Sequence, residues 1–186
     1  ISYSQEKNIP IGGVSPTGLG KRITSEKNSF KLPPNSVLYL NTLGASTTVA
    51  DVIETLNILA PKMPGALSRS FDSKYMIGIY SFDKNVPFII LKTSDYASSF
   101  AGMLKWEKDM PTDLAEVFQI PHSFASSTSL FEDEALQNKD LRILRDQNKN
   151  TILLYSFIDK NTLVITGNEN IFTAIVGKYI ISKQSE

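Results

Sequence analysis

The chain carries the segment YMIGIYSFDKNVPFIIL from Tyr75 to Leu91, and a second segment, TILLYSFIDKNTLVIT from Thr151 to Thr166, follows the same plan. In both, a Tyr-Ser-Phe run leads to Asp-Lys-Asn and then to another apolar run. Asp and Asn tolerate left-handed backbone and hydrogen-bond to their own main chain, so Asp-Lys-Asn predicts a turn. The two segments therefore predict two β-hairpins built on one template.

Helices and strands are predicted around these hairpins. A short strand is expected at 37–41, and a helix at 49–59, where apolar residues recur at intervals of three and four. The helix after the first hairpin is expected to bury a stripe made of Tyr96, Phe100, Met103 and Leu104. The lone Trp106 lies off that stripe. A closing helix carries Ile171, Ile175 and Tyr179 in one row.

This order predicts an α+β fold with an antiparallel sheet of about six strands and helices mainly on one face. Its first part follows the order of a ferredoxin-like unit, and a hairpin-helix unit is repeated over residues 75–110 and 151–183. Residues 36–186 are expected to form a single α+β domain. The two copies are too few for a solenoid.

Residues 1–35 are rich in glycine and proline and show no long period, which predicts an extended N-terminal lead-in. Whether it docks on the domain stays open, because apolar residues are scattered along it. Those residues are Ile9, Ile11, Val14, Ile23 and Phe30.

The composition excludes several classes of function. Lys and Arg total 19 and Asp and Glu total 19, so no overall field would attract nucleic acid. No apolar run reaches the roughly 18 residues of a membrane span, which predicts a soluble chain. The absence of cysteine excludes disulfides and thiolate sites. The start at Ile1 rather than Met suggests a piece of a longer protein with any anchor upstream.

The sequence contains few residues in patterns that would support catalysis or metal binding. His122 is the only histidine, it lies beside several serines, and no G-x-S-x-G turn is present. One histidine without cysteine cannot complete a zinc site. Asp146, Asn148 and Asn150 match the start of a calcium loop, but Thr151 and Phe157 stand where glycine and glutamate are required. The sequence therefore predicts no catalytic residue, no metal and no cofactor.

Candidates for binding a ligand or partner are few. Trp106 is one, because tryptophan is enriched in interface hot spots, although packing at the domain edge is the alternative. The acidic run Glu132-Asp133-Glu134 is another, set against a simply solvated loop. His122 is the third, in a long loop over residues 119–134.

Three blocks of sequence resemble uncharacterised single-pass, membrane-anchored bacterial envelope proteins. The blocks are FIILK at 88–92, FAGMLKWE at 100–107 and ILLYSFIDKNTLVIT at 152–166. The resemblance covers about residues 37–179 and implies an outward-facing soluble domain. It supplies no active residue.

Two hypotheses for function follow. The first is a non-catalytic extracytoplasmic domain that mediates protein assembly or recognition at the envelope, with another envelope protein as partner. The second is a small-ligand binder or hydrolase that uses carboxylates and His122 in a cleft near the 119–134 loop. The oligomeric state stays open.

Overall fold

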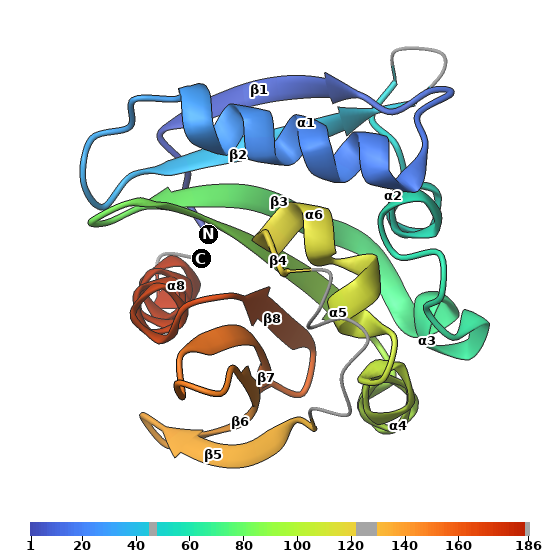
Figure 1. Cartoon of the computed structure of the whole chain (residues 1–186), viewed down its shortest axis with the longest axis vertical. Coiled ribbons are helices and arrows are strands. Elements are labelled where there is room, and N and C mark those ends of the chain that lie inside the picture. The colour runs from blue at the N-terminus through green and yellow to red at the C-terminus, as the bar shows by residue number, and fades with distance from the viewer. Residues whose placement is uncertain (45–47, 122–129, 185–186) are drawn as a thin grey trace.

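Both predicted hairpins form, and they lie side by side in one sheet (Figure 1). The computed structural model describes residues 1–44, 48–121 and 130–184. The strands are β1 (Gln5–Pro10), β2 (Val37–Leu43), β3 (Phe71–Ser81), β4 (Asn85–Thr93), β5 (Glu132–Leu136), β6 (Lys139–Arg145), β7 (Thr151–Asp159) and β8 (Thr162–Thr166). The helices are α1 (Pro16–Ser29), α2 (Val52–Leu59), α3 (Gly65–Ser70), α4 (Tyr96–Trp106), α5 (Met110–Asp113), α6 (Ala115–Phe118) and α8 (Glu169–Gln184).

The hairpins meet at the centre of the sheet. Strand β3 pairs with β4 and β7 pairs with β8, and β4 and β8 pair antiparallel, with Ile89 opposite Ile165. In the second turn, Asp159 Oδ1 accepts a hydrogen bond of 2.9 Å from the Asn161 backbone N–H, which is the local bond that the Asp-Lys-Asn motif predicts. The α+β class and the two turns are therefore confirmed.

The sheet is larger than expected. The described residues form eight strands in the order β1-β2-β3-β4-β8-β7-β6-β5 rather than about six, and β1 is parallel to β2 while the other pairs are antiparallel. Because β2 and β3 are antiparallel neighbours, they do not make the crossover of a ferredoxin-like unit. The parallel strand-helix-strand unit is instead β1-α1-β2.

The predicted extended lead-in over residues 1–35 is wrong, because it contains β1 and α1. Ser15 caps α1 by accepting a 3.2 Å hydrogen bond from the Gly18 backbone N–H, and proline follows the cap at the first helical position. Leu19 and Ile23, one turn apart, are fully buried. A Cβ on Gly20 would lie 2.4 Å from the Glu116 Cβ, so this glycine permits close packing between α1 and α6.

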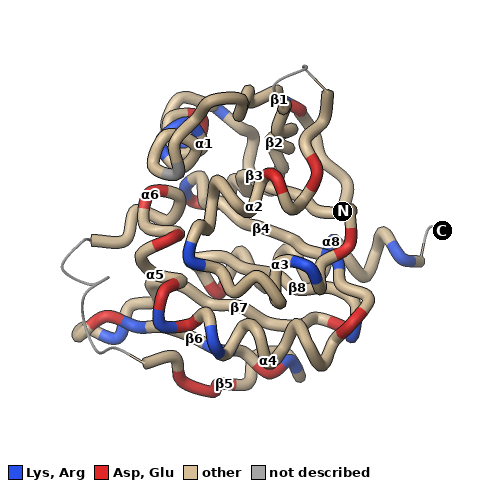
Figure 2. Tube along the Cα trace, turned by 90° about the vertical axis from the view of Figure 1, so that its right-hand side faces the viewer, with Lys and Arg blue, Asp and Glu red and all other residues tan. Residues whose placement is uncertain are grey.

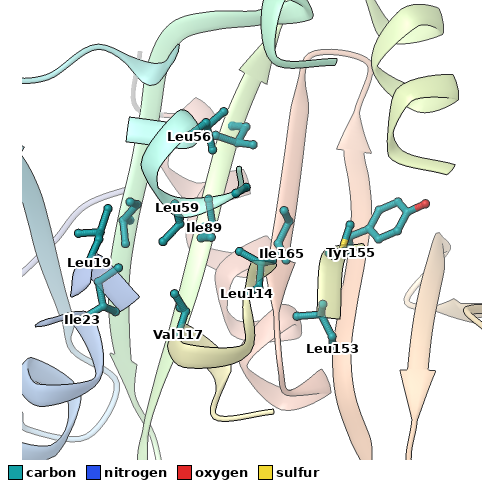
Figure 3. Close-up of a cluster of buried hydrophobic side chains, with 14 of the residues drawn as sticks. Leu19, Ile23, Leu56, Leu59, Ile89, Leu114, Val117, Leu153, Tyr155 and Ile165 are labelled. Atoms are coloured by element: carbon teal, nitrogen blue, oxygen red, sulfur yellow. The ribbon is translucent and has the colours of Figure 1, made fainter. Parts of the chain in front are cut away.

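The helices divide unequally between the two faces of the sheet. Side chains from α1 to α6 share one core with the first face, part of which is drawn in Figure 3. On the opposite face, α8 packs Ile171, Phe172 and Ile175 against a second core. Helices α4 and α8 follow equivalent hairpins but lie on opposite sides of the sheet (Figure 1). The repeated hairpin-helix order is therefore present, with its helices on different faces.

Among the helices that the structure describes, none is both long and apolar enough to cross a membrane.

Candidate functional site

Helix α4 carries apolar residues on two sides, and the structure buries the side that carries Trp106. The buried side consists of Ser99, Gly102, Met103 and Trp106. The opposite side stays at the surface, with exposed fractions of 42% for Tyr96, 38% for Phe100 and 41% for Leu104. We call these three residues the outer α4 face. The predicted buried stripe is right for Met103 and wrong for the outer α4 face.

Packing between α3 and α4 accounts for this orientation. A Cβ on Gly102 would lie 2.8 Å from the Cβ of Leu67 on α3, so glycine is the residue that lets the two helices meet. The opposite side of the helix is consequently turned away from α3.

Trp106, a predicted binding candidate, lies in the core with 1% of its surface exposed. Its Nε1 donates a 2.8 Å hydrogen bond to Oδ2 of Asp113, which also accepts one of 3.1 Å from the Lys62 backbone N–H. Burial raises the pKa of the Asp113 carboxyl, and these two bonds partly oppose that effect. Trp106 thus joins α4 to α5 from the inside and contributes nothing to the surface.

A groove of about 710 Å³ runs beside the outer α4 face. It is lined by Tyr96, Phe100 and residues 133–135, 138–142 and 155–160, which belong to α4 and to strands β5, β6 and β7 with the turns that follow β5 and β7. In Figure 2, α4 lies on the side of the molecule that faces the viewer, with β5 beneath it. We call this hollow the α4 groove.

Three aromatic rings form one wall of the α4 groove. The rings of Tyr96 and Phe100 stack with their centroids 5.8 Å apart, and Phe157 of β7 meets the ring of Tyr96 edge-on at 5.0 Å. The centroids of Phe100 and Phe157 are 6.2 Å apart. These are favourable separations for aromatic pairs, so the rings hold one another in place while two of them remain exposed.

Beneath the wall, a network of charged and polar groups joins α4 to the sheet. Arg142 binds the Glu107 carboxylate through two hydrogen bonds, of 2.8 Å from Nε and 2.9 Å from Nη2. The Tyr155 hydroxyl donates a 2.7 Å hydrogen bond to the same carboxylate. The bonds to Glu107 raise the pKa of Arg142, and burial, followed by the Glu107 contact, raises the pKa of Tyr155. Both shifts lead away from neutrality, so Arg142 stays charged and Tyr155 stays protonated near pH 7, which favours a structural role.

The acidic run lies on edge strand β5 rather than on a loop. Asp133 pairs with Arg142 at 2.9 Å, and Glu134 pairs with Arg145 at 2.6 Å. Two of the three carboxylates are thus paired with arginines of β6, and Glu132 remains exposed. Charged residues on an edge strand are a common protection against unwanted pairing with another strand.

The remaining candidates from the sequence are His122 and the segment that resembles a calcium loop. His122 lies outside the described residues. Asp146 closes the turn between β6 and β7 by accepting hydrogen bonds of 2.8 Å from the backbone N–H groups of both Asn148 and Asn150. In the described part of the chain, no three His, Asp or Glu side chains gather as a metal site would require.

Several groove residues were missed in the sequence because no motif marks them. They are Arg142, Tyr155 and Phe157, whereas Tyr96 and Phe100 were noticed but assigned to a buried stripe. The usable signal was on α4, where apolar residues lie on two sides of the helix and only one side can face the core.

Comparisons of the chain with models of protein families, with curated proteins and with solved structures found no match.

Proposed function

We propose that this chain is a non-catalytic assembly domain that associates with a second copy of itself through the outer α4 face and the α4 groove. The observation that carries the proposal is the aromatic wall, in which Tyr96 and Phe100 stay exposed beside the groove. Self-association of this domain is the form of protein assembly that we propose for its predicted role at the envelope.

The outer α4 face has the composition of a protein contact. Single exposed apolar residues are ordinary, but Tyr96, Phe100 and Leu104 follow one another turn by turn on one helix. Aromatic side chains anchor many interfaces because they bury a large area at little cost in conformational entropy. The stack of Tyr96 on Phe100 lowers that cost further because both rings are already ordered.

The shape of this surface is suited to contact with itself. In a twofold dimer the same patch is used by both copies, so it must be complementary to itself. Here a ridge, the outer α4 face, lies directly beside a hollow, the α4 groove. A twofold axis along their boundary places the ridge of each copy in the groove of the other.

The two flanks of α4 carry different sets of charged residues. The α4 groove is lined by four carboxylates and three cations, of which Asp140, Lys139 and Lys160 have no ion-pair partner among the described residues. On the other flank of α4, a shallower hollow is lined by Lys62, Lys105 and Lys108 against one carboxylate, Asp109.

The test is the mass of the protein in solution over a wide range of concentration, by light scattering and sedimentation. The wild type is expected to form dimers reversibly, and Phe100→Ser is expected to be monomeric. Phe82→Ser is the matched control, because Phe82 is also an exposed phenylalanine, at 45%, but lies next to the β3–β4 turn and away from the groove. Thermal unfolding shows whether each variant keeps its fold.

A wild type that stays monomeric at every concentration would overturn the proposal and leave the groove to a different protein. A dimer that Phe100→Ser and Phe82→Ser affect equally would overturn it as well. The predicted extracytoplasmic location is a separate part of the proposal. It is tested by asking whether protease added outside intact cells cleaves the domain.

A further inference from the structure

A second hollow, of about 730 Å³, lies at the other end of β7 from the α4 groove. It is lined by Lys27 of α1, Lys84 of the β3–β4 turn, residues 85–87, 118–120, 145, 149–152 and 167–170. Three turns or connections therefore meet around it, namely β3–β4, β6–β7 and β8–α8. Its volume is in the range of sites for small molecules. We call it the lysine cavity.

Positive charge is concentrated here without matching negative charge. The cations of the lining are Lys27, Lys84, Arg145 and Lys149, and Glu169 is the carboxylate among them. Arg145 is already used, because its Nη2 lies 2.6 Å from Glu134 and 3.0 Å from Glu169. None of the three lysines forms an ion pair with any carboxylate that the structure describes.

Lys27 is held in place beside Lys84. The Lys27 ammonium donates a hydrogen bond to the side-chain oxygen of Gln119. Asn85 fixes the same region, since its Nδ2 donates bonds of 2.8 Å to the backbone oxygens of Lys27 and Phe30. Burial, and then the charge of Lys84, lowers the pKa of Lys27. An anion between the two ammonium groups would relieve this repulsion.

The third lysine is positioned by the turn that resembles a calcium loop in sequence. Asp146 accepts bonds from Asn148 and Asn150, and Lys149 between them adopts left-handed backbone with φ of 61°. Gln119, the partner of Lys27, is also left-handed, with φ of 55°. Such backbone is unfavourable for both residue types by about 1 kcal/mol. Both residues with left-handed backbone, Gln119 and Lys149, line the lysine cavity.

The rest of the cavity lining contains both polar and apolar residues. Asn150, Thr151, Asn168 and Asn170 supply polar groups, and Val86, Phe118, Ile120 and Ile152 supply apolar surface. Lysines act as compact charges and bind phosphate oxygens well. We infer that the lysine cavity binds a phosphorylated small molecule, with its phosphate between Lys27, Lys84 and Lys149 and its organic part against the apolar side chains.

Titration calorimetry with inorganic tripolyphosphate at low ionic strength tests this inference. Lys84→Gln and Lys149→Asn are each expected to weaken binding about tenfold, the effect of losing one charge-assisted hydrogen bond. Asparagine is chosen at position 149 because it accepts left-handed backbone. Lys160→Gln is the matched control: Lys160 occupies the equivalent position in the second Asp-Lys-Asn turn, outside the lysine cavity.

Vesicles separate the two sources of phosphate. If the natural ligand is a lipid headgroup, vesicles of phosphatidylglycerol bind the wild type, vesicles of phosphatidylcholine do not, and Lys84→Gln abolishes the difference. If the ligand is a free phosphorylated molecule, tripolyphosphate binds and neither vesicle does. The inference is overturned if neither probe binds, or if Lys160→Gln weakens binding as much as Lys84→Gln. It is independent of self-association, so Phe100→Ser should bind tripolyphosphate normally.

Discussion

Tyr96 and Phe100 lie one turn apart on α4 with their rings stacked, 5.8 Å between centroids, and both remain exposed at the edge of the α4 groove. A helix that only supports the sheet would place polar residues on this side. The two rings, supported from β7 by Phe157, instead give the surface a rigid apolar ridge. Its position relative to the sheet depends on the contacts beneath it.

The Arg142–Glu107 pair is expected to be the main polar support of α4. Their side chains are 19% and 16% exposed, so Arg142→Ala leaves a poorly solvated carboxylate and should lower the free energy of unfolding by about 3 kcal/mol. Lys108→Ala removes a cation from the same region, where its side chain is 80% exposed, and should change stability by less than about 0.5 kcal/mol. Urea unfolding measures both. Similar small effects for the two variants would contradict the structural role of the pair.

Substitution by alanine at two helical glycines is expected to change the stability of the protein in opposite directions. Gly20→Ala places a Cβ 2.4 Å from the Cβ of Glu116 and is expected to destabilise the protein by about 1–3 kcal/mol through overpacking. Gly177→Ala on α8 meets no atom within 4 Å and is expected to stabilise the helix by up to about 1 kcal/mol. Thermal unfolding distinguishes them, and a stabilising Gly20→Ala would show that α1 and α6 do not pack this closely.

Asp113 should make stability depend on pH in an unusual direction. Its pKa is raised in the folded protein, mainly by burial, so the folded state binds the proton more tightly than the unfolded state. The contribution of Asp113 to the free energy of unfolding is therefore complete below the unfolded-state pKa of 3.8. It is lost as the pH rises through the higher pKa of the folded state. In Asp113→Asn this loss is expected to disappear, while the amide oxygen still accepts from Trp106.

For Asp95 the change of stability with pH is expected to have the opposite sign. Its side chain caps α4, and hydrogen bonds from Ser98 lower its pKa, so its contribution is present above the unfolded pKa and lost as pH falls. Unfolding by urea at a series of pH values from acid to neutral measures both residues. For each variant, the difference in free energy of unfolding from the wild type is followed against pH. The same slope for Asp113→Asn and Asp95→Asn would refute the opposite pH dependences assigned to the two residues.

Anion binding in the lysine cavity should weaken as alkaline pH is approached. Because burial and Lys84 lower the pKa of Lys27, its charge is lost at a lower pH than the usual 10.5 of lysine. The affinity for tripolyphosphate is therefore expected to fall before ordinary surface lysines titrate, and more salt should weaken it at every pH. Affinity that stays constant up to the ordinary pKa of lysine would exclude Lys27 from the site.

The sequence was most informative where a local pattern determines structure. Apolar runs on either side of an Asp-Lys-Asn turn were enough to locate both hairpins. The row of Ile171 and Ile175 on the closing helix was also confirmed.

The sequence misled where a tertiary contact decides between two local solutions. Apolar residues lie on both sides of α4, and the buried side is the one where Gly102 meets Leu67 and where Ser99 hydrogen-bonds to Ser70 and Thr93. Strand β5 has an acidic sequence typical of loops, and becomes a strand beside the arginines of β6. The glycines of α1 suggested coil, although Gly20 allows a helix to pack closely. None of these contacts is visible in a single sequence.

The most direct test of self-association uses the absence of cysteine from the chain. Ala101→Cys, an exposed position on α4, is labelled with a nitroxide, and the distance between labels is measured by pulsed electron paramagnetic resonance. The proposed dimer predicts one narrow distance between copies, which disappears when Phe100→Ser is added and persists with Phe82→Ser. The absence of any distance between copies, or a narrow distance that Phe100→Ser leaves unchanged, would contradict association through the outer α4 face.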